Sequence, residues 1–153
     1  MTERIDEWRT WLQAAGRASR TIEEWMRNIR RFARESGTDP ETATHVDIAD
    51  WLSSHDGNRR RAWSNSTKAT YHSTLSAWFS WLVKMEYRTD NPIMKVGRPR
   101  VPVGVPHPVA DAHMPALLTT RMHRSTRVMI LLCALAGLRV HEVAKIRGED
   151  VDL

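Results

Sequence analysis

Three residues near the carboxyl end of the chain, Gly137, Arg139 and Glu142, follow an almost wholly apolar run and place an arginine and a carboxylate three positions apart. Glycine permits a sharp end to the apolar run before it, so Arg139 is predicted to emerge near the start of the next helix. Its planar guanidinium can present two parallel donors to two phosphate oxygens, which lysine cannot imitate. Glu142 lies on the same helical face three positions later, where we expect it to orient Arg139 or brace the helix.

Two groups of basic residues favour a polyanionic partner, and above all double-stranded DNA. The first is predicted to lie along one helical face, opposite a row of apolar side chains, and comprises Arg20, Arg27, Arg31 and Arg34, with Arg30 beside it. The second combines a basic loop with the polar start of the next helix and comprises Arg59, Arg60, Arg61, Asn65, Ser66, Thr67, Lys68 and His72. Residues 59–88 hold six Lys or Arg against one acid, a local charge of +5.

The basic and the polar members of these groups are expected to contact different parts of DNA. Lysine and arginine neutralise phosphates and supply sequence-independent affinity that weakens with salt. Polar side chains near a helix start can also read base edges in the major groove. An ordinary solvated helix face is the alternative for either group alone. A third basic set, Lys95, Arg98 and Arg100, lies in a stretch without acids, and the three sets together favour DNA binding.

The composition is that of a globular chain with a substantial core. Its 153 residues are 41% hydrophobic and include seven Trp, and the formal net charge is +5. A single cysteine, Cys133, excludes a disulfide framework. Neither a signal-peptide pattern nor an apolar run of the roughly 18 residues that span a membrane is present, so we expect a cytoplasmic protein. The histidines lack metal-ligand spacing, and we expect neither a metal nor a cofactor.

Apolar residues at helical spacing predict four helices in the first ninety residues. They are 2–15, a second from Ser19 or from Thr21 (with Glu24 in capping-box spacing) to Gly37, 44–54 and 66–86. The predicted inward residues are Ile5, Trp8, Leu12, Ile22, Trp25, Met26, Ile29, Phe32, Ala33, Val46, Ile48, Ala49, Leu52, Tyr71, Leu75, Trp78, Phe79 and Leu82. Such a pattern requires no sheet and predicts an all-α fold.

Five prolines and two glycines between Pro92 and Pro108 predict a stiff, extended linker over residues 93–108. Three further helices are predicted beyond it, over 110–121, 125–136 and 139–146. The middle one is apolar on every side, a pattern typical of complete burial in a domain larger than these residues provide.

Three stretches resemble the phage-integrase family of tyrosine recombinases. SRTIEEWMRNIRRFARE is similar to the opening of the family's core-binding domain, and NSTKATYHSTLSAWFSWLVKMEYRTDNP is similar to its last long helix with the terminating Asn-Pro. LLCALAGLRVHEVAKIRGEDVDL is similar to the first catalytic box. The order of bundle, Asn-Pro, basic proline-rich linker and Gly-Leu-Arg box matches the family over nearly the whole chain.

The resemblance implies a four-helix, SAM-like core-binding bundle over residues 1–92, which would lie on one face of the DNA. It also implies an interdomain linker over 93–108 and the start of a truncated catalytic domain over 109–153. In the family, a tyrosine attacks the scissile phosphate to form a 3′-phosphotyrosine. Arg139 would stabilise the charge of that transition state, with Glu142 in support. The parent enzyme would act as a tetramer on attachment-site DNA in a bacterial host.

The family also requires a His-x-x-Arg box and a nucleophilic tyrosine, and neither is in place. No histidine of this sequence has arginine three positions later, and the two tyrosines, Tyr71 and Tyr87, fall in the predicted bundle. We therefore expect binding of core-type DNA without cleavage, by a monomer or an oligomer that swaps helices. The alternative is a helix-turn-helix regulator, with Gly137 in the turn and polar Arg139 on the second helix.

Overall fold

The computed structural model describes residues 2–54, 63–105 and 108–150. They divide into two compact units, Met1–Val103 and Gly104–Leu153. Every regular element of the described residues is helical, which confirms the predicted all-α class.

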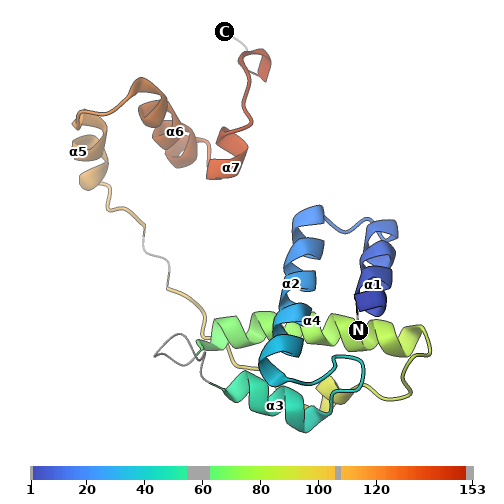
Figure 1. The fold of residues 1–153 in the computed structure, drawn as a ribbon. Coiled ribbons are helices and arrows are strands. Elements are labelled where there is room, and N and C mark those ends of the chain that lie inside the picture. The colour runs from blue at the N-terminus through green and yellow to red at the C-terminus, as the bar shows by residue number, and fades with distance from the viewer. Residues whose placement is uncertain (1, 55–62, 106–107, 151–153) are drawn as a thin grey trace. The chain divides into compact units, whose positions relative to one another are not determined.

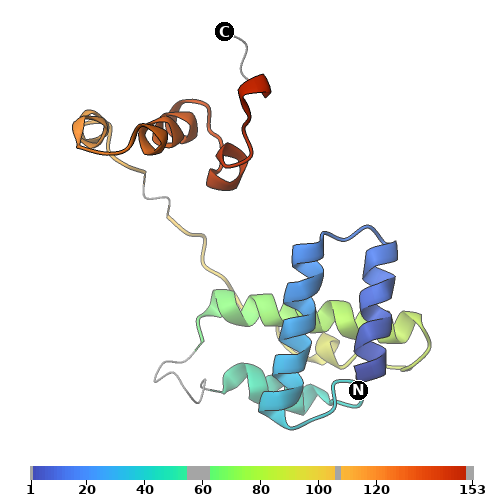
Figure 2. The same cartoon turned by 45° about the horizontal axis from the view of Figure 1, so that its top comes forward.

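Unit 1 contains α1 (Thr2–Ala14), α2 (Ser19–Ser36), α3 (His45–Ser53), α4 (Asn65–Lys84) and the 3-10 turn η1 (Pro92–Lys95). Helices α1 and α2 lie side by side and antiparallel, and α4 crosses both (Figures 1 and 2). Helix α3 packs against α2 and α4, and η1 packs against α3 and α4. The four predicted helices of the bundle are confirmed, within two residues at each end.

Local signals set most of these boundaries. Gly16, two residues after the end of α1, and Gly37, directly after α2, both adopt a φ of 69°, the left-handed conformation that ends a helix. Thr44 and Asp47 form a reciprocal capping box at the start of α3. The capping box predicted for α2 at Thr21 is wrong, because α2 begins at Ser19 without a side-chain cap.

The core is built around tryptophan. Trp8 stacks on Trp25 with ring centroids 5.6 Å apart and meets the edge of Trp78 at 5.2 Å. On α3, the predicted inward residues Val46 and Ala49 are exposed. The indole of Trp51 is buried instead, because it packs against Phe32 and Tyr71 and so turns that side of the short helix inward.

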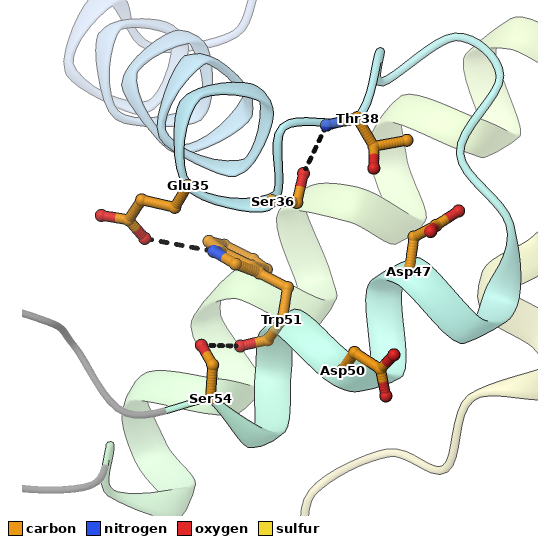
Figure 3. Close-up of a pocket in the computed structure, with 7 residues that line it drawn as sticks. All are labelled: Glu35, Ser36, Thr38, Asp47, Asp50, Trp51 and Ser54. Carbon is orange, nitrogen blue, oxygen red and sulfur yellow. Dashed lines mark hydrogen bonds between the residues drawn. The ribbon is translucent and has the colours of Figure 1, made fainter.

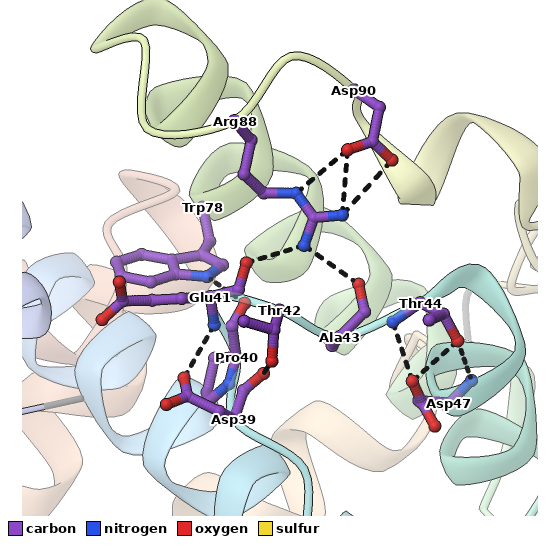
Figure 4. Close-up of polar contacts among 10 residues, drawn as sticks. All are labelled: Asp39, Pro40, Glu41, Thr42, Ala43, Thr44, Asp47, Trp78, Arg88 and Asp90. Carbon is purple, nitrogen blue, oxygen red and sulfur yellow. Dashed lines mark hydrogen bonds and ion pairs between the residues drawn. The ribbon is translucent and has the colours of Figure 1, made fainter.

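A tryptophan and an arginine bind the loop between α2 and α3 to the end of α4 (Figure 4). Trp78 Nε1 donates to the carbonyl of Pro40 at 2.9 Å. Arg88 Nη1 donates to the carbonyls of Glu41 at 2.6 Å and Ala43 at 3.1 Å, and its Nη2 contacts Asp90. Arg88 is one of the six basic residues counted in the local charge of +5 over residues 59–88, but its N–H donors are engaged inside the fold.

The beginning of the predicted linker belongs to the bundle. Pro92–Lys95 form η1, and Ile93 is 2% exposed in the tryptophan core. The prediction of an extended chain from residue 93 is wrong for this short stretch. Burial of the apolar Ile93 side chain is favourable enough to hold residues 92–95 against the bundle, although the segment as a whole is rich in proline.

Unit 2 contains α5 (His113–Thr119), α6 (Arg124–Leu135), α7 (Val140–Val143) and the 3-10 turn η2 (Gly148–Asp150). All three α-helices exist where the sequence predicts helices, but α5 and α7 are shorter. Val143 is the one buried residue among those described in unit 2. Helix α6 accordingly exposes apolar side chains such as Val128 and Leu135. None of the helices described in either unit has the length and apolarity to cross a bilayer.

Candidate nucleic-acid interface

The outer face of α2 carries a row of exposed arginines. Arg20, Arg27 and Arg34 recur every seven residues, opposite the buried face of Ile22, Met26 and Ile29. At 1.5 Å per residue, the row spans about 21 Å. Arg20 and Arg27 are exposed and have no hydrogen-bond or ion-pair partner among the described residues, while Arg34 is 73% exposed and 3.7 Å from Glu35. The predicted basic stripe thus exists at these three positions.

The two other arginines of the predicted stripe have partners inside the bundle. Arg31 Nη1 donates to the hydroxyl of Tyr71 at 2.6 Å, and its Nε donates to Glu35 at 2.7 Å. Its guanidinium also lies 5.3 Å from the ring of Trp63. Arg30 remains about half exposed and lies 3.6 Å from Asp6 of α1. Arg31 is therefore a packing residue, and only Arg30 of this pair keeps an accessible charge.

The start of α4 combines a cap with exposed polar groups. Ser64 accepts from the backbone N–H of Thr67, whose hydroxyl lies 2.9 Å from Ser64 Oγ. The Thr67 side chain is thus part of the cap. Ser66 is exposed, and Lys68 is half-buried without a partner among the described residues. The predicted DNA contacts Arg59, Arg60 and Arg61 lie outside the described residues.

The segment after η1 runs along α4. Asn65 Nδ2 donates to the carbonyl of Arg100 at 2.9 Å, and His72 Nε2 lies 3.3 Å from the carbonyl of Val96. Asn65 and His72 are two helical turns apart, about 10.5 Å. Four extended residues span a similar distance, about 13 Å. The segment therefore lies antiparallel to the first half of α4, with the exposed Arg98 between its two attachment points.

A groove of about 300 Å³ opens beside this segment. It is lined by Trp25, His72, Ser73, Ser76, Ala77, Ser80 and Arg98. The lining contains an arginine, a histidine and three hydroxyls, and no carboxylate. Its composition suits an anion.

The sequence reasoning above missed Ser73 and Ser76 as candidate site residues. A helical projection of residues 66–86 carries the signal, because Ser66, Ala69, Ser73, Ser76 and Ser80 fill the face opposite Trp78. From Ser66 to Ser80 that face has only small side chains, so another backbone can approach α4 closely there.

A second pocket, between α2 and α3, has the opposite character (Figure 3). Its volume is about 270 Å³, and Glu35, Asp47 and Asp50 are among its lining residues. Trp51 Nε1 donates to Glu35 at 3.1 Å and so fixes one of these carboxylates. Its carboxylates contrast with the groove beside α4, whose lining residues include none.

In unit 2, Arg139 precedes α7 and is paired with Glu142. The backbone N–H of Arg139 donates to Glu142 Oε2 at 2.7 Å, and Arg139 Nη1 lies 3.5 Å from Glu142 Oε1. The Arg139 side chain is 76% exposed, so most of its donors remain available to a ligand. Gly137 has a φ of 67°, as its predicted role in the turn requires.

The two tyrosines have structural partners in unit 1. Tyr71 is 7% exposed, and its hydroxyl accepts from Arg31. The Tyr87 hydroxyl donates to Glu7, which raises the pKa of Tyr87. Both hydroxyls are thus engaged within unit 1. No cluster of three or more potential metal ligands occurs within the described parts of the chain.

Comparison with known proteins gives one consistent result. A family model described as the phage integrase N-terminal SAM-like domain matches residues 5–89, more than half of the chain. The chain is 26% identical to tyrosine recombinase XerA of Thermococcus kodakarensis, over 99% of this chain and 50% of the relative. It is likewise 26% identical to tyrosine recombinase XerD of Xanthomonas axonopodis pv. citri, over 95% of this chain and 49% of the relative.

A solved structure shares both sequence and fold. The integrase from mycobacterium phage Brujita is 43% identical, with a TM-score of 0.61, over 97% of this chain and 50% of that one. The chain thus spans about half the length of each of these relatives.

Proposed function

Because the chain belongs to the tyrosine recombinase family, we propose that it is the DNA-binding half of a site-specific recombinase and binds the core of an attachment site. The observations that support this most are the row of exposed arginines on α2, of which Arg20 and Arg27 have no partner among the described residues, and the groove beside α4, whose lining residues include no carboxylate. Both features belong to unit 1, the unit that contains the matched SAM-like domain.

The proposed DNA-contacting surface differs from the sequence-based set by a few residues. It comprises Arg20, Arg27, Arg30, Arg34, Ser66, Lys68, Lys95, Arg98 and Arg100, with Arg59, Arg60 and Arg61 retained from the sequence alone. Arg31, Asn65, Thr67 and His72 position other groups instead, because their side chains are engaged within unit 1.

Salt titration tests the binding proposal. Each phosphate neutralised by Lys or Arg contributes about 0.9 to the slope of log K against log salt concentration. Fluorescence anisotropy with labelled duplexes should give a slope of several units. Preference for an attachment-site core should appear as tighter binding at equal salt. Affinity that does not change with salt concentration would contradict the proposal.

For the second unit, we propose that Arg139 neutralises the scissile phosphate in a complete recombinase and that Glu142 orients it. Because these 153 residues contain no His-x-x-Arg box and both tyrosines lie in the bundle, the chain should bind DNA without cleaving it. A suicide substrate with a nick beside the cleavage site tests this directly. A covalent protein–DNA adduct on a denaturing gel would refute it.

The helix-turn-helix alternative makes a different prediction for the same residue. In that motif the second helix enters the major groove. Here the corresponding helix, α7, is four residues long, about one turn. Arg139→Ala should leave the affinity for duplex DNA within about twofold of the unchanged chain under the recombinase proposal. A large loss of affinity would favour the regulator.

A further inference from the structure

The groove beside α4 has the features of a seat for one phosphate group. Arg98 lies on its rim with no partner among the described residues, and Ser73 and Ser76 supply hydroxyl donors. The volume of about 300 Å³ equals that of roughly ten water molecules at about 30 Å³ each, so an anion can enter with part of its hydration.

The position of Arg98 is fixed before any ligand arrives. Its segment is attached to α4 on both sides, through Asn65 to Arg100 and through His72 to Val96. A carbonyl oxygen can only accept, so His72 Nε2 carries the hydrogen of the bond to Val96 and positions the segment. Ordering the segment in advance lowers the entropic cost of binding through Arg98.

We propose that one backbone phosphate of duplex DNA occupies this groove, held by the Arg98 guanidinium and by the hydroxyls of Ser73 and Ser76. The small side chains on the outer face of α4 allow the DNA backbone to approach to this depth. The inference rests on the proposed function and adds a specific contact to it. It also makes residues 96–100 part of the DNA-binding surface of unit 1.

The exposed arginines of α2 do not supply an equivalent site. Arg20, Arg27 and Arg34 stand on an open helix face, where each can follow a phosphate as a mobile charge. Arg98 instead combines a charge with a concave surface and two hydroxyls. Its removal should cost more than the removal of one surface charge, because hydrogen bonds to a charged group are stronger than neutral ones.

The test compares charge-matched variants of the full chain on one duplex across a salt series. Arg98→Ala should lower the slope of log K against log salt concentration by about 0.9, the contribution of one phosphate. Arg98→Lys should restore the slope because it keeps the charge. Arg9→Ala removes the same charge from α1, which contributes no residue to the groove, and should leave the slope unchanged.

A second pair of variants probes the interior of the groove. Ser76→Asp places a carboxylate against the proposed phosphate and should weaken duplex binding by well over tenfold, while Ser76→Ala should weaken it less, because it removes one hydrogen bond and adds no repelling charge. Thermal unfolding followed by circular dichroism shows whether each variant is folded. Because Arg98 is exposed, its replacement should leave the fold intact.

The outcomes separate this inference from the proposed function. If the unchanged chain binds duplex DNA without salt dependence, the proposed function fails. If it binds with salt dependence and Arg98→Ala retains the slope of Arg9→Ala, the phosphate seat is wrong and DNA binding stands.

Discussion

At the scale of single residues, arginines at similar sequence spacing have different roles. Arg27 and Arg31 are one turn apart on α2, and both fall in the predicted basic stripe. Arg27 has no partner among the described residues, whereas Arg31 binds Glu35 and the hydroxyl of Tyr71. The same residue type is therefore exposed at one position and engaged in internal packing one turn later.

Replacement of each arginine by alanine should separate these roles. Arg27→Ala should change the free energy of unfolding by less than about 0.5 kcal/mol, as for a surface position. It should lower the salt slope for DNA by about 0.9. Arg31→Ala should destabilise unit 1 by about 1–2 kcal/mol, because it removes the hydrogen bonds from the guanidinium to the Tyr71 hydroxyl and to Glu35. Chemical denaturation and anisotropy measure the two effects, and equal stability of both variants would contradict this assignment.

At the scale of elements, the start of α3 depends on a local cap. Thr44 Oγ1 accepts from the N–H of Asp47 at 3.3 Å, and the Asp47 carboxylate accepts from the N–H of Thr44 at 2.7 Å. The hydroxyl and N–H of Thr44 lower the pKa of Asp47. The capping box therefore holds Trp51 of α3 in the core through two residues that lie on the surface.

The capping box predicts a pH-dependent stability. Thr44→Ala should cost about 1 kcal/mol at neutral pH. Since the Asp47 pKa is depressed in the fold, its contribution is complete above the ordinary value of 3.8 and is lost as the pH falls through the lowered pKa. Denaturation of the Asp47→Asn variant should lack that part of the acid dependence. An identical acid profile for the variant and the unchanged chain would show that the cap does not titrate.

At the scale of the whole molecule, the two units differ in the depth of their cores. Unit 1 buries large side chains such as Trp8, Trp78 and Phe79, whereas Val143 alone is buried among the described residues of unit 2. Helix α6 and its neighbours also line an apolar groove of about 440 Å³. Burial of apolar surface is the main source of stability, so unit 1 should be much the more stable unit.

Amide hydrogen exchange tests this difference. Amides of α4 should exchange with the free energy of global unfolding of unit 1, while those of α6 should exchange through openings of far lower free energy. Protection of α6 equal to that of α4 in a dilute monomer would contradict this prediction. Light scattering on the same sample checks that self-association does not protect α6.

The sequence by itself determined the helices, most of their buried faces, and the family through the bundle and the Gly-Leu-Arg box. These features depend on residues within one or two turns of each other, such as Thr44 with Asp47 or Gly37 after α2. Only Val46 and Ala49 were assigned to the wrong face, on a helix too short for its periodicity to be decisive.

The tertiary structure alone decided which predicted site residues are free to act. Arg31 is engaged by a tyrosine 40 positions away, and Asn65 by a carbonyl 35 positions away. Such pairs leave no mark in helical periodicity, because it reports which way a side chain faces and not what lies opposite. The groove beside α4 arises in the same way, since Arg98 becomes part of it only when its segment folds back along the helix.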